Sequence, residues 1–407
     1  MRISKVKAHL LTYQLRRPFV MQFVLGKRTV HRRHAMLIEV NTDEGITGWG
    51  SGDPGEMGNR NWKPSDFAAL INRKVSAVLQ GESPLDRDHI WTKMAAESGL
   101  KGAALTQCFG GVDIALWDIA GKVANRPICD LIGRRRQSVR AYASAGMYMP
   151  ADGYVAEARE MAGAGFTAYK MRPGVSPAAD MAAVEAVRSA EPDLALLVDS
   201  HTWWRAAPDI YTRSVIFDLA KSMDGLSIHW LEDPLDYRDM ASYVELTALM
   251  ENRVSTGENE QTPDDHIRLI DNKACDTVIV DVRLAGGITK CLEVARHANA
   301  AGLEYAAHSF SDMVSQAASA HIMLTVENPA LFEYPTYACA RWRGMYDNEL
   351  VTALVDQEIP FADGFVTVSG RPGLGLEPLP DIERRFPYQE GYWTTWESPD
   401  GRLIAAQ

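Results

Sequence analysis

Three acidic residues stand at the ends of three successive runs of apolar residues, and their types suit a metal site. They are Asp199 in LALLVDS, Glu232 in LSIHWLEDP and Glu258 in NRVSTGE. Together they offer only carboxylate oxygens, a hard donor set that suits Mg²⁺ and leaves positions open for substrate oxygens. One such acid alone would more often cap a helix or pair with an arginine. Three at matching positions predict a magnesium site.

Three further polar residues follow at the same kind of position: Asp281 in TVIVDV, His308 in LEYAAHS and Glu333 in ALFEYP. Asp281 and His308 end consecutive predicted strands, so the carboxylate can accept the proton of one imidazole nitrogen while the other nitrogen faces a shared site. A lone histidine in such a run is more often a core residue. The neighbouring aspartate favours His308 as a catalytic base.

Lys170, Arg172 and His201 complete the set of candidates. Residues i and i+2 of a strand point to the same face, so Lys170 and Arg172 should bring two cations to the site. There they can neutralise a carboxylate or enolate oxygen; the alternative is a surface pair. The same spacing relates His201 to Asp199. It makes His201 a candidate acid or, alternatively, a hydrogen-bond partner of the metal carboxylates.

The spacing of these residues indicates the fold that positions them. From Glu232 to Glu333 they recur about every 25 residues, the length of one strand plus one helix. In a (β/α)8 barrel each strand directs its C-terminal end to one mouth, where residues distant in sequence meet. Eight strands are predicted, at residues 139–144, 166–172, 194–200, 227–233, 253–258, 277–282, 303–309 and 330–334. Segments with helical spacing, such as 181–190 and 288–301, separate them and predict an α/β fold with a parallel sheet.

The remaining segments predict a second module. Residues 1–130 combine alternating strands, joined by a turn at 43–45, with an amphipathic helix in GGVDIALWDIAGKVANRP, which is typical of an α+β domain. The barrel is assigned to 131–355, and the Gly- and Pro-rich tail 356–407 is expected to pack back on the first module. Residues 18–33 and 51–64 are long and polar and predict a mobile lid.

Composition excludes several classes of function. A net charge of −11 over 407 residues gives no electrostatic footprint for nucleic acid or an anionic membrane. The chain shows neither a signal core nor a stretch approaching the ~20 apolar residues of a membrane helix. Its five cysteines are scattered without CxxC spacing, which indicates neither disulfides nor zinc. A cytoplasmic enzyme is the simplest expectation, and an acidic protein that binds an acid needs a metal or local cations.

The motifs GFTAYKMRPG, LLVDSHTWW, HWLEDPL, STGE, IVDVRLAGGIT, AAHS and FEYP occur in this order. With them the chain resembles the mandelate racemase subgroup of the enolase superfamily and, within it, the acid-sugar dehydratases. The resemblance covers nearly the whole chain. It implies an α+β capping domain over a modified (β/α)7β barrel, with Mg²⁺ on the three strand-end acids. It also implies an Asp281–His308 general acid/base dyad, Glu333 as a hydrogen-bond donor to the enolate oxygen, and a homo-oligomer.

One departure from the family pattern bears on the reaction. Members with two bases usually show Lys-x-Lys on the second strand, whereas this chain has Lys170-Met171-Arg172. An arginine stays protonated at any ordinary pH and makes a poor base. Because racemisation needs a base on each face of the α-carbon, Arg172 argues against it. The Asp199-x-His201 pair instead resembles the galactonate and mannonate dehydratases, in which the histidine handles the departing hydroxyl.

The expected reaction is therefore β-elimination of water from a small sugar acid, an aldonate or aldarate. His308 takes the α-proton, the metal, Lys170 and Glu333 stabilise the enediolate, and His201 protonates the leaving 3-hydroxyl to give a 2-keto-3-deoxy acid. The alternatives are racemisation, epimerisation or cycloisomerisation at the same carbon, and a sugar-acid binder without turnover. Side chains expected to set specificity are His31, Arg33, His34, Asn59, Trp62, Trp203 and Trp204, although Trp203 and Trp204 fit equally well as core or interface aromatics.

Overall fold

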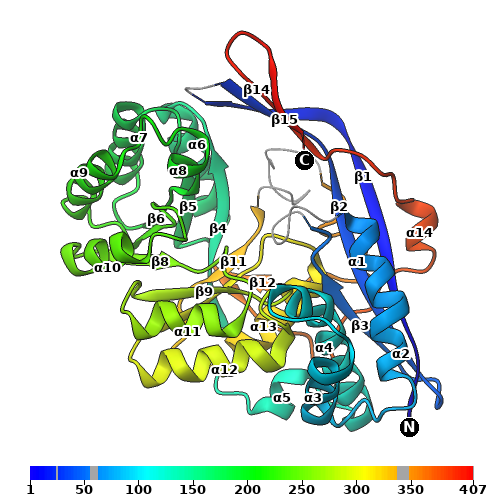
Figure 1. Cartoon of the computed structure of the whole chain (residues 1–407). Coiled ribbons are helices and arrows are strands. Elements are labelled where there is room, and N and C mark those ends of the chain that lie inside the picture. Colours follow the sequence, from blue (N-terminus) through cyan, green and yellow to red (C-terminus); the bar gives the residue numbers. More distant parts are fainter. Residues whose placement is uncertain (24–25, 56–62, 337–347, 407) are drawn as a thin grey trace.

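The computed structural model describes residues 1–23, 26–55, 63–336 and 348–406, which form a β/α barrel with a sheet-and-helix cap beside it (Figure 1). The barrel strands are β4 (Val139–Met147), β5 (Ala168–Arg172), β6 (Ala195–Asp199), β7 (Trp230–Glu232), β8 (Arg253–Thr256), β9 (Thr277–Asp281), β10 (Glu304–His308) and β11 (Phe332–Tyr334). The helices between them are α6 (Ala151–Gly163), α7 (Pro177–Ala190), α9 (Arg213–Asp224), α10 (Met240–Leu249), α11 (Pro263–Asp271), α12 (Gly287–Ala300) and α13 (Met313–Met323).

The barrel is closed by its last strand. Strands β4 to β10 pair in parallel in sequence order, β11 pairs in parallel with β4, and a bridge between Tyr305 and Pro329 joins the β10 side. Seven strand–helix units and a final strand make up the circle, which confirms the predicted (β/α)7β architecture. All eight predicted strands are present, most of them shorter than predicted, and β7 and β11 are the shortest at 3 residues each.

Local sequence explains the regularity of the units. Helix α7, for example, begins after Ser176, whose side chain accepts a hydrogen bond from the Ala179 main chain, and Pro177 occupies its first turn. One cluster that includes Tyr142, Trp230 and Ile279 is buried separately from the much larger core that the strands and outer helices share. The barrel is thus a packed core, and the chemistry is left to the C-terminal ends of the strands.

The cap contains three strands and several helices from the first third of the chain. They are β1 (Ile3–Phe23), β2 (Gly26–Thr42), β3 (Thr47–Gly52), α1 (Pro64–Leu70), α2 (Ser76–Leu79), α3 (Arg87–Glu97), α4 (Ala103–Ala124) and α5 (Ile128–Ile132). Helix α4 lies directly on β3. A Cβ on Gly50 would come within 1.9 Å of the Gly111 carbonyl oxygen, so only glycine permits this approach.

The sequence predicts a mobile lid loop at residues 18–33, but the described residues of this segment form β-strands instead. Strands β1 and β2 pair antiparallel out to Phe23 opposite Gly26. The register shifts between Gln14 and Phe19, a bulge that accommodates Pro18, which cannot donate to the ladder, and pairing then resumes. Of the second predicted lid, residues 56–62 lie outside the described residues.

The tail divides between the barrel and the cap. Strands β12 (Phe361–Ala362) and β13 (Phe365–Val366) form a hairpin that pairs with β4. After α14 (Ile382–Arg385), strands β14 (Thr394–Glu397) and β15 (Leu403–Ala406) join the cap sheet through pairing of β14 with β2 (Figure 1, red against blue). The predicted packing of the tail on the first module therefore describes β14 and β15. It also describes residues 373–377, where the Leu374 main-chain N–H donates to Asp118 of α4 at 2.8 Å and Lys122 of α4 pairs with Glu377. Strands β12 and β13 instead pack on the barrel. The domain boundaries at residues 130 and 355 stay predictions.

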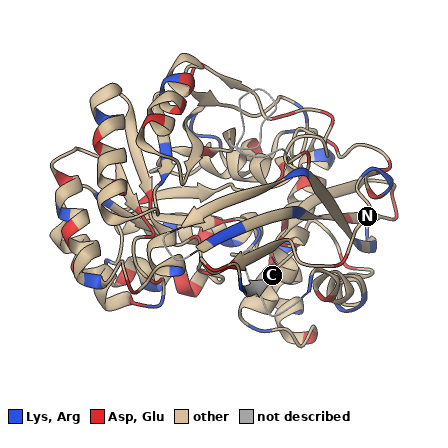
Figure 2. Ribbon diagram, turned by 90° about the horizontal axis from the view of Figure 1, so that it is seen from above, with Lys and Arg blue, Asp and Glu red and all other residues tan. Residues whose placement is uncertain are grey.

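The structure shows where the charged residues and the cysteines lie. Figure 2 shows acidic and basic residues interspersed along the elements. Within residues 1–23, 26–55, 63–336 and 348–406, no helix is long and apolar enough to cross a bilayer. Four cysteines are buried free thiols: Cys108, Cys129, Cys275 and Cys291. Cys339 lies outside the described residues.

Candidate active site at the barrel mouth

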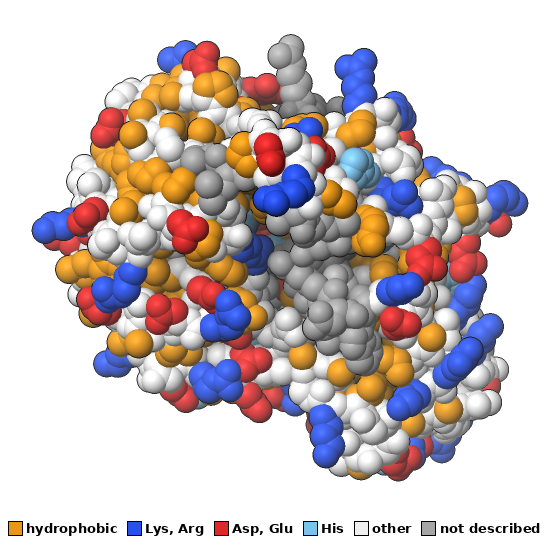
Figure 3. All heavy atoms as spheres, turned by 45° about the horizontal axis from the view of Figure 1, so that its top comes forward, with side chains coloured by type: hydrophobic (Ala, Val, Ile, Leu, Met, Phe, Trp, Pro, Cys, Tyr) orange, Lys and Arg blue, Asp and Glu red, His pale blue; other side chains and the backbone are white. Residues whose placement is uncertain are grey.

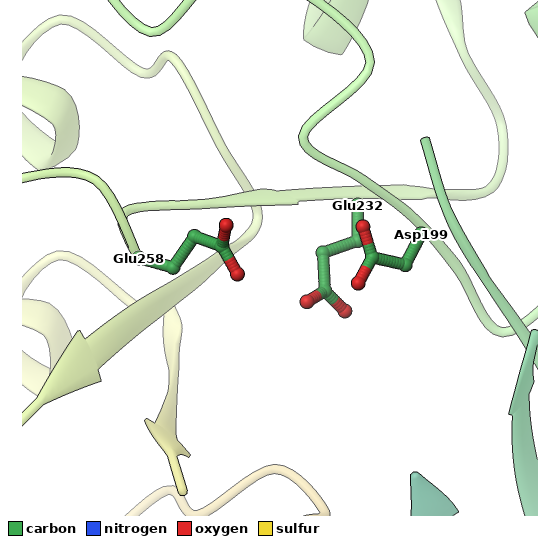
Figure 4. A group of neighbouring side chains, drawn as sticks. All are labelled: Asp199, Glu232 and Glu258. Atoms are coloured by element: carbon green, nitrogen blue, oxygen red, sulfur yellow. The ribbon is translucent and has the colours of Figure 1, made fainter. Parts of the chain in front are cut away.

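The three strand-end acids meet at the mouth of the barrel. Asp199 and Glu232 end β6 and β7 and are partners in the ladder. Glu258 follows β8 after Gly257, whose φ of +129° and close approach to the Ile279 carbonyl oxygen leave no room for a side chain. One oxygen of each acid lies within 4.8 Å of the others, and Figure 4 shows the carboxylates turned toward a common space. We call these three residues the carboxylate trio.

The trio fits a hard divalent cation. All three side chains are buried, and burial raises the pKa of Glu232 to about 7 against the opposing charge of Lys170, with Asp199 adding to the rise. Buried carboxylates this close repel one another, and a divalent cation among them would relieve that repulsion. Three oxygen donors around one space are a donor set for Mg²⁺. The three carboxylate donors of the site therefore fit the predicted cofactor, Mg²⁺.

The two cations of β5 lie inside the site, which excludes the alternative of a surface pair. Lys170 Nζ is 2.7 Å from Glu232 Oε1, 3.1 Å from Glu333 Oε1 and 3.4 Å from Asp199 Oδ2. Arg172 Nε is 3.1 Å from the same Asp199 oxygen. Burial lowers the pKa of both groups, but the surrounding carboxylates raise each above its usual value. These carboxylates therefore favour the protonated, positively charged form of both side chains.

His308 and Asp281 make the predicted contact. They are ladder partners on β10 and β9, and His308 Nδ1 is 2.8 Å from Asp281 Oδ2. Arg283, at i+2, binds the same carboxylate with its Nη2 2.6 Å from Oδ2. Burial lowers the pKa of His308, but the Asp281 hydrogen bond and the charges of Glu333 and Glu258 raise it to about 9. Its Nε2 lies 3.5 Å from Glu258 Oε2 and so faces the trio.

His201 reaches the site from a different element than predicted. Strand β6 ends at Asp199, and His201 opens the short helix α8 (His201–Ala206), so the i, i+2 rule for strands does not place it. Its Nδ1 lies 2.7 Å from Asp199 Oδ1. Its Nε2 lies 3.3 Å from the hydroxyl of Tyr148. One nitrogen thus binds a trio carboxylate, while the other is directed away from it.

Glu333, in the middle of β11, is an acceptor in this arrangement. Its Oε1 accepts from the Ser144 hydroxyl at 2.7 Å and its Oε2 from the Ser309 main-chain N–H at 2.7 Å. Burial raises the pKa of Glu333, but Lys170, His308 and Arg172 bring it down to about 2. A carboxylate only accepts hydrogen bonds. The donor role implied by the family resemblance therefore needs a proton that these charges oppose.

A cavity of about 620 Å³ opens over the trio, and its lining includes Asp199, Glu258, both histidines and Arg172. Figure 3 shows one face of the molecule, on which acidic and basic side chains are scattered among apolar ones. The cap and tail supply another wall of the cavity. The cavity is therefore shared by the barrel, the β1–β2 hairpin and the end of the tail.

The predicted specificity residues divide into four groups. Arg33 and Trp204 line the cavity. Trp203 is fully buried, stacked on Tyr211, so the reading as a core aromatic is correct for it. His31 and His34 hydrogen-bond to Thr395 and Thr12 and are absent from the cavity wall. Asn59 and Trp62 lie outside the described residues.

Sequence reasoning missed several residues at the site. Tyr148 follows the first barrel strand, and the end of YASAGMY was its only signal. Phe310 comes two residues after His308, a spacing that was available but not used. Trp393 and Trp396 also line the cavity. They gave no signal, because their place depends on pairing between the two ends of the chain.

Two protein-family domains match most of this chain. Residues 6–133 match the mandelate racemase / muconate lactonizing enzyme N-terminal domain, and residues 153–382 match the enolase C-terminal domain-like family. The chain belongs to the enolase superfamily. Within it, the N-terminal match assigns this superfamily member to the mandelate racemase/muconate lactonizing enzyme family.

The relatives of this chain are named for different reactions. D-galactarolactone cycloisomerase of Agrobacterium fabrum is 28% identical over 95% of this chain and 99% of its own. L-talarate/galactarate dehydratase of Salmonella typhimurium is 28% identical over 77% of this chain and 74% of its own. Among solved structures, a putative mandelate racemase from Bordetella bronchiseptica complexed with 2-oxoglutarate/phosphate is 29% identical, covers 96% and 98% of the two chains and has a TM-score of 0.83. Family membership therefore leaves the substrate and the reaction open.

Proposed function

We propose that the chain is a Mg²⁺-dependent dehydratase that removes water from a sugar acid to give a 2-keto-3-deoxy acid. The observation that carries the proposal is the placement of two histidines at opposite members of the trio. His308 lies beside Glu258, and His201 lies beside Asp199. Elimination needs a base at the α-carbon and an acid at the departing hydroxyl, and two histidines supply both.

Each residue has a part in this reaction. Mg²⁺ bound by the trio would supply positive charge that neutralises the substrate carboxylate and makes the α-proton more acidic. In the neutral form of His308, Asp281 holds the proton on Nδ1, so Nε2 is the atom that accepts the α-proton. Lys170 and Arg172 hold fixed positive charge where the enediolate oxygens develop negative charge. Asp199 accepts the Nδ1 proton of His201, which leaves Nε2 to protonate the 3-hydroxyl as it departs.

Cycloisomerisation is a second candidate, because the cycloisomerase relative spans nearly the whole chain. It begins with the same α-proton transfer and conserves the mass of the substrate. Incubating the Mg²⁺-loaded enzyme with a panel of aldonic acids, aldaric acids and their lactones, followed by mass spectrometry, separates the two. Loss of one water with formation of a keto acid supports the dehydratase. A product of unchanged mass from a lactone overturns it in favour of the cycloisomerase.

Replacing His201 with Asn should separate the two halves of the reaction. Dehydration should fall about 10²- to 10⁴-fold, the usual contribution of a general acid. Exchange of the α-proton with solvent deuterium should continue at a measurable rate, because His308 and its Asp281 contact are untouched. NMR in D₂O together with a keto-acid assay measures both rates. Dehydration at the parental rate would show that another residue, with Lys170 the next candidate, is the acid.

Replacing Arg172 with Lys tests the racemase alternative. If Arg172 only supplies charge, the variant should retain dehydration with a KM raised several-fold, because lysine loses the planar fork of donors. The parent should use one α-epimer of its substrate and leave the other unchanged. Incubating each epimer in D₂O and following it by NMR checks both points. Deuterium incorporation with inversion and without keto acid would identify Arg172 as part of a second base.

A further inference from the structure

A continuous series of side-chain contacts runs around the cavity from one histidine to the other. In its first half, the rings of His308 and Phe310 have centroids 6.4 Å apart. The Arg33 guanidinium carbon lies 5.7 Å from the Phe310 ring centroid and 5.1 Å from that of Trp393. The barrel, the cap and the tail are thereby joined in three contacts.

The second half returns to His201. The Arg28 guanidinium carbon lies 4.7 Å from the Trp393 ring and 5.1 Å from the Trp396 ring. Trp396 stacks on Phe23 at 5.6 Å, and Phe23 meets the edge of Tyr148 at 4.8 Å. Tyr148 contacts His201 Nε2, as described above. The seven side chains between the histidines all line the cavity, and we call them the girdle.

The tail completes the girdle. Trp393 contacts both arginines, and Trp396 joins Arg28 to Phe23. Trp396 lies opposite Arg28 in the β14–β2 ladder, and the Trp393 carbonyl oxygen accepts a hydrogen bond from the His31 main-chain N–H at 2.9 Å. Arg28 Nε also donates to the Thr394 hydroxyl at 3.0 Å. This segment lies beyond residue 382, where the match to the family ends, so the wall it forms lies outside the matched family domains.

The chemistry of the girdle indicates what it binds. A guanidinium group stacked on an aromatic ring is held in a fixed plane, and its edge matches the two oxygens of a carboxylate. Two such groups, from Arg28 and Arg33 of β2, line the cavity on the wall that the cap and the tail supply. The trio and its cation would take the reacting carboxylate. The wall of the cap and the tail is therefore suited to a second carboxylate.

We propose that residues 393–397, β14 together with the residue before it, form a substrate-specificity element. Trp393 and Trp396 are positioning residues that hold Arg28 and Arg33, and these two arginines bind a carboxylate at the end of the substrate remote from the trio. The substrate is then a dicarboxylic sugar acid. The assignment of the reacting end rests on the proposed function; binding at the girdle itself does not require turnover.

The test measures binding rather than turnover. The Mg²⁺-loaded His308→Asn protein is titrated calorimetrically with galactarate and galactonate, glucarate and gluconate, and mannarate and mannonate, and with gluconate 6-phosphate as a phosphate probe. At least one diacid should bind about tenfold or more tightly than its monoacid, the contribution of a charge-assisted hydrogen-bonded pair. Adding Trp393→Leu should reduce that ratio to about twofold or less. Tyr392→Leu, an exposed aromatic next to it in the chain and absent from the cavity wall, should leave the ratio unchanged.

A second pair of variants tests the proposal independently, in case Trp393→Leu fails to fold. Arg33→Met should lose the preference for the diacid, whereas Arg32→Met should keep it, because Arg32 is absent from the cavity wall and its guanidinium lies near the Gln389 and Glu390 carbonyl oxygens. Equal binding of diacid and monoacid in every pair overturns the proposal. So does an unchanged ratio in both Trp393→Leu and Arg33→Met, or tighter binding of the phosphate ester than of every diacid. Failure of the dehydratase proposal would instead appear as absence of water loss with the binding ratios intact.

Discussion

His308→Asn should abolish dehydration, by about 10²- to 10⁴-fold or to below detection, and should stop exchange of the substrate α-proton in D₂O. Asparagine preserves much of the size of histidine and can still hydrogen-bond to Asp281. It offers no nitrogen that can accept a proton. Because the α-proton is removed before any bond to the 3-hydroxyl breaks, both measurements should fail together, unlike in the His201 variant.

The surface supplies a matched control for His308. His297 also contacts an aspartate, with its Nε2 2.7 Å from Asp271 Oδ1, but the pair is exposed and joins helices α11 and α12 rather than the ends of barrel strands. His297→Asn should leave both rates within about twofold of the parent, as surface pairs contribute little. Continued exchange in His308→Asn at the parental rate would assign the base to another residue.

Removal of the divalent cation should abolish turnover, and added Mg²⁺ should restore it. The physical reason is the mutual repulsion of three buried carboxylates, which a dication relieves. Binding to the folded state alone also stabilises it, by about 2.7 kcal/mol at a hundredfold excess over Kd. Mg²⁺ should therefore raise the unfolding temperature of chelator-treated protein. Full activity in metal-free protein would contradict the assignment of the trio as a metal site.

Glu258→Gln tests the same site without chelator. The variant should fold, since glutamine fills the same space, but should bind Mg²⁺ more weakly, because a neutral amide replaces one of three charges. Its thermal shift on adding Mg²⁺ should be smaller than that of the parent. Glu260→Gln is the control: Glu260 lies two residues away and is buried, but it is not part of the trio. Its thermal shift should match the parent's.

The barrel and the trio could be predicted because both depend on short local stretches of sequence. Each strand ends a short apolar run, and parallel strands in a barrel bring their ends to one mouth, so Asp199, Glu232 and Glu258 converge without knowledge of any distant pairing. His201 shows the limit of this reasoning. Its residue type and neighbour were correct, but the chain had already left β6 for a helix.

The cap wall could not be predicted, since it depends on contacts between the two ends of the chain. A bulge allowed β1 and β2 to continue through residues that looked like a polar loop. Nothing near Trp393 in the sequence indicates that β14 pairs with β2. The homo-oligomer, the cytoplasmic location and the particular sugar acid stay predictions, as does the division of roles among the site residues.

The pairing of β14 with β2 also fixes an order of events during synthesis. Arg28 and Thr394 touch although 366 positions separate them. Until the last strands leave the ribosome, this stretch of β2 is an open sheet edge, the kind of surface that invites wrong partners. The barrel mouth and its metal ligands can assemble earlier, from residues 139–334. The part of the enzyme that distinguishes one acid from another therefore forms after the barrel mouth.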